Sequence, residues 1–200
     1  MRSVYPLQLG LVIALAFLAG CMMTTTISVS PAAGLSPSAA SGTSIYIELF
    51  SDERPFHNNV VASFPTGQQF VLDRDVPSVL RDAVAAALRA RGHPVASTPQ
   101  RGAPVVKGAT LACDVAISSR FSRMYADSAV GVRLTVYSPD GEPIGAPRVY
   151  SASGRSSSWF MAWTPTLAVQ AIDQALLRLA QSLASDESLA HAIERGTGSR

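Results

Sequence analysis

The sequence predicts an α+β domain in which an antiparallel or mixed sheet of about four to six strands has two main helices packed on one face. Three observations predict this class. Residues 75–91 repeat apolar side chains at the spacing of one helix face, and residues 164–183 do so again. Before and between them lie segments rich in β-branched and aromatic residues. The order of strand, helix, several strands and helix is typical of an α+β sandwich.

The first expected strand covers residues 44–50, because Ser-Ile-Tyr-Ile-Glu-Leu-Phe is rich in β-branched and aromatic side chains and has turn formers on both sides. Residues 52–69 contain several Pro, Asn and Gly residues, and they predict a loop with at most a short strand at residues 60–64. Residues 70–72 can add another short strand.

The first helix is the best-defined element of the sequence. Asp75 can accept backbone N–H bonds as its N-cap, Pro77 is tolerated in the first turn, and Gly92 can adopt the left-handed conformation that ends a helix. Residues 93–96 then predict a short edge strand. The apolar positions of the expected inward face are Val76, Val79, Leu80, Ala83, Val84, Ala87 and Leu88.

The middle of the chain predicts an antiparallel meander. The later part of residues 105–119 is an expected strand, residues 120–127 are expected to form a hairpin loop, and residues 129–137 alternate as a second strand. Residues 138–141, Ser-Pro-Asp-Gly, favour a turn, and residues 148–155 predict a further strand. One face of the second strand is expected to consist of Val130, Val132, Leu134 and Val136.

A second long helix is expected to begin at Thr164, which can serve as N-cap before Pro165 at the first helical position. Asp186 can cap a last short helix, which places Leu189 and Ile193 one turn apart. The inward seam of the long helix is expected to contain Ala168, Ala171, Ile172, Ala175, Leu176, Leu179 and Leu183.

The N-terminus has the order of a secretory signal: a positive charge at Arg2, an apolar run over residues 9–18, and small residues before Cys21. This run is shorter than the roughly 20 apolar residues that a helix needs to cross a membrane. Residues 18–21, Leu-Ala-Gly-Cys, resemble the lipobox of bacterial lipoproteins, whose cysteine receives a diacylglycerol and, after cleavage, a further acyl chain such as palmitate. The alternative is an ordinary signal peptide that leaves a soluble periplasmic protein.

We therefore expect a lipoprotein signal peptide at residues 1–20, a lipidated Cys21 heading a disordered tether over residues 21–44, and a single domain over residues 45–195. The tether is expected because its sequence is rich in Thr, Ser, Ala, Gly and Pro. The residue after Cys21 is Met22, whereas an Asp at this position would resemble the inner-membrane retention signal of enterobacterial lipoproteins. The expected location is therefore the periplasmic side of the outer membrane, which the protein binds through its lipid anchor.

The composition argues against several chemistries. The formal net charge is only +2 and the basic residues are scattered, so no nucleic-acid partner is expected. His57, His93 and His191 lack metal-ligand spacing, and no nucleophile elbow or phosphate-binding loop occurs. Cys113 lies in an apolar run and is expected as a buried core thiol, with Asp114 on the opposite face of the strand. We therefore expect no enzyme activity, no cofactor and no metal.

The residues Trp159, Phe160 and Trp163 form an aromatic cluster, with Met161, between the last strand and the long C-terminal helix. Two interpretations are open. The cluster can pack beneath the helices as part of the core, or it can be a contact surface for an envelope protein partner or for lipid.

The lipobox, the polar tether, the strand, the helix ending Leu-Arg-Ala-Arg-Gly-His-Pro-Val, the long hairpin strands and the C-terminal helix together resemble the YajG-like family of uncharacterised bacterial lipoproteins. The resemblance concerns architecture. The lipid anchor, together with the lack of a catalytic constellation, favours a non-catalytic binding or structural module in the cell envelope. The alternative is an accessory lipoprotein of an ABC-type lipid transport system, which has a similar layout. An envelope hydrolase has only scattered Ser, His and Asp residues in its favour.

Overall fold

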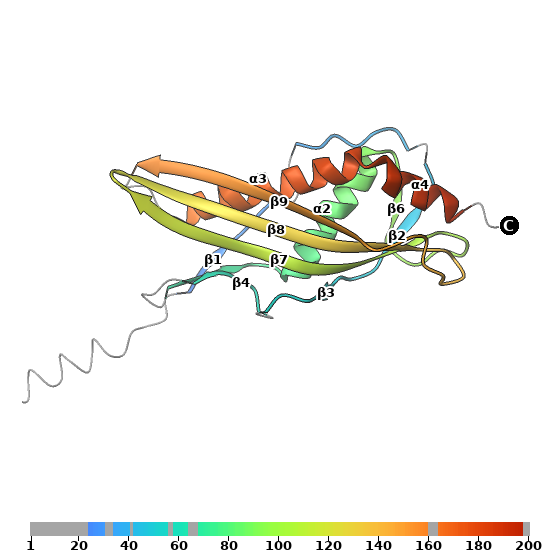
Figure 1. The fold of residues 1–200 in the computed structure, drawn as a ribbon, viewed down its shortest axis with the longest axis horizontal. Helices are drawn as coiled ribbons and strands as arrows, with labels where there is room; N and C mark the ends of the chain where they lie inside the picture. The colour runs from blue at the N-terminus through green and yellow to red at the C-terminus, as the bar shows by residue number, and fades with distance from the viewer. Residues whose placement is uncertain are drawn as a thin grey trace, which may run out of the picture.

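A computed structural model describes residues 24–30, 34–40, 42–55, 58–63, 68–159 and 164–197. Over these residues the chain forms a mixed six-stranded sheet, a smaller three-stranded sheet and helices α2, α3 and α4 (Figure 1). The expected α+β class is therefore confirmed.

Three long antiparallel strands dominate the larger sheet: β7 (Val105–Arg120), β8 (Arg123–Tyr137) and β9 (Arg148–Trp159). Short strands pair in parallel on the other side of β7, so the sheet is mixed. The order is β6-β2-β7-β8-β9, with β3 also paired to β7. The short strands are β2 (Ile45–Ile47), β3 (Ser51–Asp52) and β6 (Val95–Ala96).

The β7–β8 hairpin is longer than the sequence predicts. Residues 123–127, expected in a loop, belong to β8, and the turn is only Phe121 and Ser122. A bulge between Thr110 and Ala112 shifts the alternation of inward and outward side chains along β7 by one residue. Thr110 before the bulge and Cys113 after it therefore both face inward. A single alternating pattern therefore does not run through residues 105–120, which explains why only their later part was expected as a strand.

The helices begin at the expected caps. The Asp75 carboxylate accepts the Ser78 N–H at 2.9 Å and starts α2 (Val76–Ala90), after which Gly92 has a φ of 88°. Asp186 starts α4 (Glu187–Arg195). Between them, α3 (Thr164–Ser185) packs along β9, β8 and β7, and α2 packs beside it (Figure 1). All seven residues of each expected inward seam are buried.

The hydrophobic core lies between the helices and one face of the larger sheet, and its described members run from Ile27 to Ile193. The small sheet has the order β1-β5-β4 and closes one side of this core with Ile27, Phe70 and Leu72. Its strands are β1 (Thr24–Ile27), β4 (Val60–Ser63) and β5 (Gln69–Leu72). Short strands at residues 60–64 and 70–72 were thus correctly anticipated.

The segment that was expected as a disordered tether differs most from expectation. We call residues 24–30, 34–40 and 42 the N-terminal strap. Its β1 pairs in parallel with β5, the Ser30 N–H donates to Asp173 Oδ1 of α3 at 2.8 Å, and the Ser38 N–H donates to the Arg89 carbonyl at 3.2 Å. The strap therefore belongs to the folded domain, because partners distant in sequence supply its backbone hydrogen bonds.

Candidate functional site

Cys21, the expected lipid attachment residue, lies outside the described residues, as does the whole expected signal peptide. The first described residue, Thr24, is only three positions further along the chain and is already paired with Gln69 of β5. Three extended residues span at most about 11 Å. Any group attached to Cys21 is therefore held close to the folded domain.

Trp159 is the one member of the expected aromatic cluster that the structure describes; Phe160 and Trp163 lie outside the described residues. Trp159 is the last residue of β9, and its side chain is 65% exposed. The interpretation as core packing is therefore wrong for Trp159. The Arg123 guanidinium lies over its ring, 5.3 Å from the ring centre.

Strand register brings further residues to Trp159. Arg120 pairs with Arg123, and Arg123 pairs with Trp159, so the three side chains form one row across the ends of β7, β8 and β9 on the face away from the helices. Phe121 occupies the turn beside them and is fully exposed. We call Arg120, Phe121, Arg123 and Trp159 the hairpin tip.

A small polar pocket of about 240 Å³ adjoins the hairpin tip on the same face. Arg155 of β9 pairs with Asp127 of β8 on one side of it. Arg120 lines the pocket and has no ion-pair partner among the described residues. Its other lining residues, Ser118 and Tyr125, contribute hydroxyl groups. The pocket thus combines one unpaired cation with neutral hydrogen-bond donors.

Sequence reasoning missed Phe121, Arg120 and Arg123, because it assigned them to a hairpin loop. A signal was present: the four residues Arg-Phe-Ser-Arg put a large aromatic side chain between two cations where a turn was expected. Natural two-residue hairpin turns favour Asn-Gly or similar pairs instead. The register that brings Trp159 to the same place is a property of the folded sheet.

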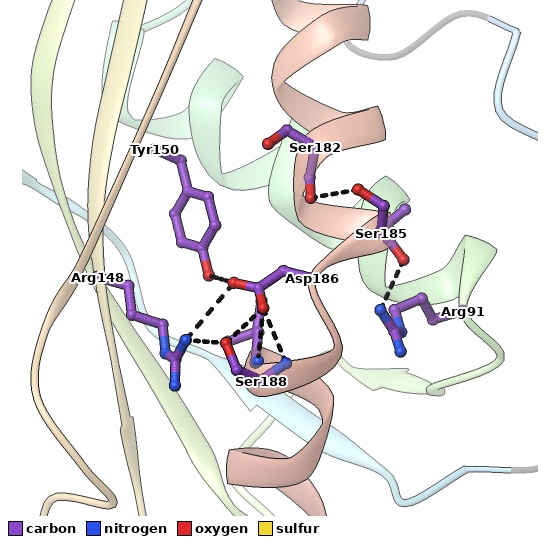
Figure 2. A network of polar contacts seen from close by, with 9 residues as sticks. Arg91, Arg148, Tyr150, Ser182, Ser185, Asp186 and Ser188 are labelled. Atoms are coloured by element: carbon purple, nitrogen blue, oxygen red, sulfur yellow. Dashed lines mark hydrogen bonds and ion pairs between the residues drawn. The ribbon is translucent and has the colours of Figure 1, made fainter.

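A second polar cluster, around Asp186, has a structural role (Figure 2). The Asp186 carboxylate accepts the backbone N–H of Ser188 at 2.8 Å and of Leu189 at 3.2 Å, and the Tyr150 hydroxyl donates to it at 2.6 Å. Arg148 of β9 lies 3.6 Å from the same carboxylate. Burial of Asp186 by itself raises its pKa, but the hydrogen bonds outweigh this and lower the pKa to about 2. The cluster joins the start of α4 to β9.

The remaining reactive groups are also placed for structure. Burial raises the pKa of the Cys113 thiol to about 12, so this core residue is not a thiolate. Asp114 is exposed on the opposite face, as expected. Arg54 is buried and holds Asp52 through two hydrogen bonds of 2.9 and 2.8 Å. Within the described ranges, no group of three His, Cys, Asp or Glu side chains could hold a metal ion.

His93 is buried beside Gly42, and His191 is exposed on α4 beside Glu194; His57 lies outside the described residues. The structure therefore does not bring the described histidines together. In the part of the chain that the structure describes, no helix has the length and apolar character needed to span a membrane.

The fold is shared with a crystal structure of a protein from Xanthomonas campestris that is assigned to the family DUF330. The two superpose with a TM-score of 0.56 at 13% sequence identity, over 86% of this chain and 98% of the other. This likeness shows a common fold and no more.

Two other matched structures are more distant. A minor lipoprotein from Acinetobacter baumannii has a TM-score of 0.41 and 15% identity, over 71% of this chain and 93% of its own. The rare lipoprotein B from Shewanella oneidensis has a TM-score of 0.38 and 16% identity, over 56% of this chain and 89% of its own. No family model and no curated protein sequence matches this chain, so its resemblance to the YajG-like lipoproteins stays a prediction.

Proposed function

We propose that the chain is a bacterial lipoprotein, anchored on the periplasmic side of the outer membrane by lipid on Cys21, that acts as a non-catalytic binding or structural module of the cell envelope. The observation that carries the proposal is the strap. Because Thr24 is already part of a sheet, a lipid on Cys21 would hold the domain directly against the membrane surface. Two or more acyl chains are enough for firm attachment.

The polar clusters of the domain support a role without catalysis. Asp186 caps a helix, Arg54 and Asp52 pair with each other, and Cys113 is a protonated core residue. Each of these groups is used to hold elements of the fold together. The hairpin tip, by contrast, carries exposed aromatic side chains, and it is the surface through which we expect the domain to act.

Cys21→Ser is expected to move the protein from the membrane fraction to the soluble periplasmic fraction, because the substituted side chain has no thiol to acylate. The change is measured by cell fractionation, together with mass spectrometry of the processed N-terminus. Cys113→Ser is the matched control, since it removes the other cysteine and is expected to leave the protein in membranes. Membrane association that survives Cys21→Ser, or an unmodified Cys21, would contradict the anchor.

Affinity capture of the lipidated protein from membranes tests the module role. Envelope proteins that are recovered with the wild type but not with Trp159→Ala support an interaction surface. Recovery of subunits of an ABC-type lipid transporter would instead favour the accessory role that the sequence also allows.

A further inference from the structure

We propose that the hairpin tip is a membrane-contact site that binds an anionic phospholipid surface, with the adjoining pocket receiving a headgroup phosphate. This deepens the proposed function, because the membrane in question is the one in which Cys21 would be anchored. The two proposals fail separately, since the hairpin tip can be tested on a chain that carries no lipid.

Two large aromatic side chains are exposed at the hairpin tip. Phe121 has a φ of 55°, a backbone conformation that bulky residues rarely adopt and that Asn or Gly adopts readily. Trp159 is 65% exposed at the end of the neighbouring strand. A Trp ring is favoured at the interface between lipid and water, where its body is buried and its N–H stays solvated, and the wholly apolar Phe ring adds buried area beside it.

The charges of the hairpin tip complement an anionic surface. Arg120 and Arg123 have no ion-pair partner among the described residues, and Arg123 stacks on the Trp159 ring. A guanidinium beside hydroxyl donors is suited to phosphate, and here Arg120 meets the hydroxyls of Ser118 and Tyr125 around a pocket of about 240 Å³. Arg155, the second cation of the pocket, is already neutralised by Asp127. Arg120 is therefore the cation that remains available for the phosphate.

The position of the hairpin tip in the fold also fits a membrane. Figure 1 shows the β7–β8 turn and the start of β1 toward the same end of the long axis of the molecule. Because β1 starts three residues after Cys21, an anchored domain presents this end to the bilayer. The aromatic side chains and cations of the hairpin tip would then lie at the depth of the headgroups.

The proposal is tested by vesicle flotation with the chain from Met22 onward, which lacks Cys21 and retains every described residue and the whole described core. The probes are vesicles of phosphatidylcholine alone and of equal parts phosphatidylcholine and phosphatidylglycerol. We expect binding to the anionic vesicles that weakens with salt. Arg120→Gln with Arg123→Gln should weaken it roughly 30-fold, since each cation near an anionic surface contributes roughly fivefold. Trp159→Ser should weaken it roughly tenfold.

Val149→Ser is the matched control for Trp159→Ser. Val149 is 64% exposed and lies on the same strand and the same sheet face, at the end remote from the hairpin tip. It should leave vesicle binding unchanged, and circular dichroism should show all variants folded. The proposal is overturned if the wild-type chain does not bind anionic vesicles, in which case a protein partner is the better occupant. It is equally overturned if Val149→Ser weakens binding as much as Trp159→Ser.

Phe121→Asn separates a binding role of Phe121 from a structural one. Asn relieves the left-handed backbone conformation and is expected to raise the melting temperature by about 2 to 4 °C. The same change is expected to weaken binding to anionic vesicles roughly tenfold, because the aromatic ring is gone. A higher melting temperature together with weaker vesicle binding supports the proposal. A lower melting temperature, or unchanged vesicle binding, contradicts it.

Discussion

Gly154→Val is expected to lower the free energy of unfolding by more than about 3 kcal/mol. Gly154 lies in β9 on the face that α3 covers. A Cβ atom at this position would lie 1.9 Å from the Ala171 carbonyl oxygen and 2.7 Å from the Ala175 backbone nitrogen. Both are backbone atoms of α3, so no side-chain rotation relieves the overlap. Either β9 or the whole helix has to move.

A shift of α3 is costly because its contact surface consists of small residues at close range. Ala168, Ala171 and Ala175 are fully buried, and the Ser156 hydroxyl donates to the Leu167 carbonyl at 2.6 Å. Moving the helix outward would open cavities and break this hydrogen bond. The prediction is measured by equilibrium unfolding in urea, and Gly154→Ala should show a smaller loss of the same origin.

Gly131→Ala is the control for this prediction. Gly131 lies in the neighbouring strand on the opposite face, and the nearest atom to a Cβ there is 3.6 Å away, an ordinary contact distance. Its substitution should change the free energy of unfolding by less than about 0.5 kcal/mol. If Gly154→Val unfolds at the same urea concentration as the wild type, the result contradicts the close approach of the α3 backbone to β9 at Gly154.

Asp186→Ala is expected to cost about 3 kcal/mol of stability at neutral pH. The substitution removes the N-cap of α4 and also leaves the buried Tyr150 without the carboxylate that accepts its hydroxyl proton (Figure 2). Arg148 loses its ion-pair partner at the same time. Asp75→Ala is the matched control, because that carboxylate caps α2 through Ser78 alone and its loss should cost about 1 kcal/mol. Equal losses in the two variants would contradict a joint role of Asp186.

The pH dependence of unfolding provides a second measurement on Asp186. Its pKa is about 2 in the folded protein against an ordinary value of 3.8, so between these values the unfolded chain binds more protons and stability rises with pH. The contribution of about 2 kcal/mol is fully present above pH 4 and is lost as the pH falls through 2. Asp186→Asn retains a capping side chain but does not titrate. Its unfolding free energy should therefore vary less over this window than that of the wild type.

The helices and their ends were predictable because the information is local. An inward stripe repeats within each helix, and the caps at Asp75 and Asp186 contact backbone groups two or three residues away. The left-handed Gly92 and the turn closed by the Gly141 N–H on the Ser138 carbonyl are also local features. Each of these elements lies where the sequence placed it.

The sheet was harder to predict at the end that carries the hairpin tip. Ala126 falls in the expected hairpin loop and Ser128 falls between that loop and the expected strand, yet both are buried strand positions. Ser128 pairs with Gly154, where the α3 backbone leaves no room for a Cβ atom. A helix more than 30 positions away in sequence thus covers this part of β8, and periodicity alone does not show it.

By itself, the sequence determined the α+β class and the helix boundaries. It also contains no recognised catalytic motif, and it predicts a lipid anchor at Cys21. Only the tertiary structure decided that residues 24–30, 34–40 and 42 form a strap and that Trp159 joins Arg120, Phe121 and Arg123 at one end of the molecule. The physical reason is that the strap obtains its hydrogen bonds from β5 and from Asp173, 143 positions from Ser30, and that strand register sets the neighbours of Trp159. Contacts between such distant residues leave no periodic trace in either segment.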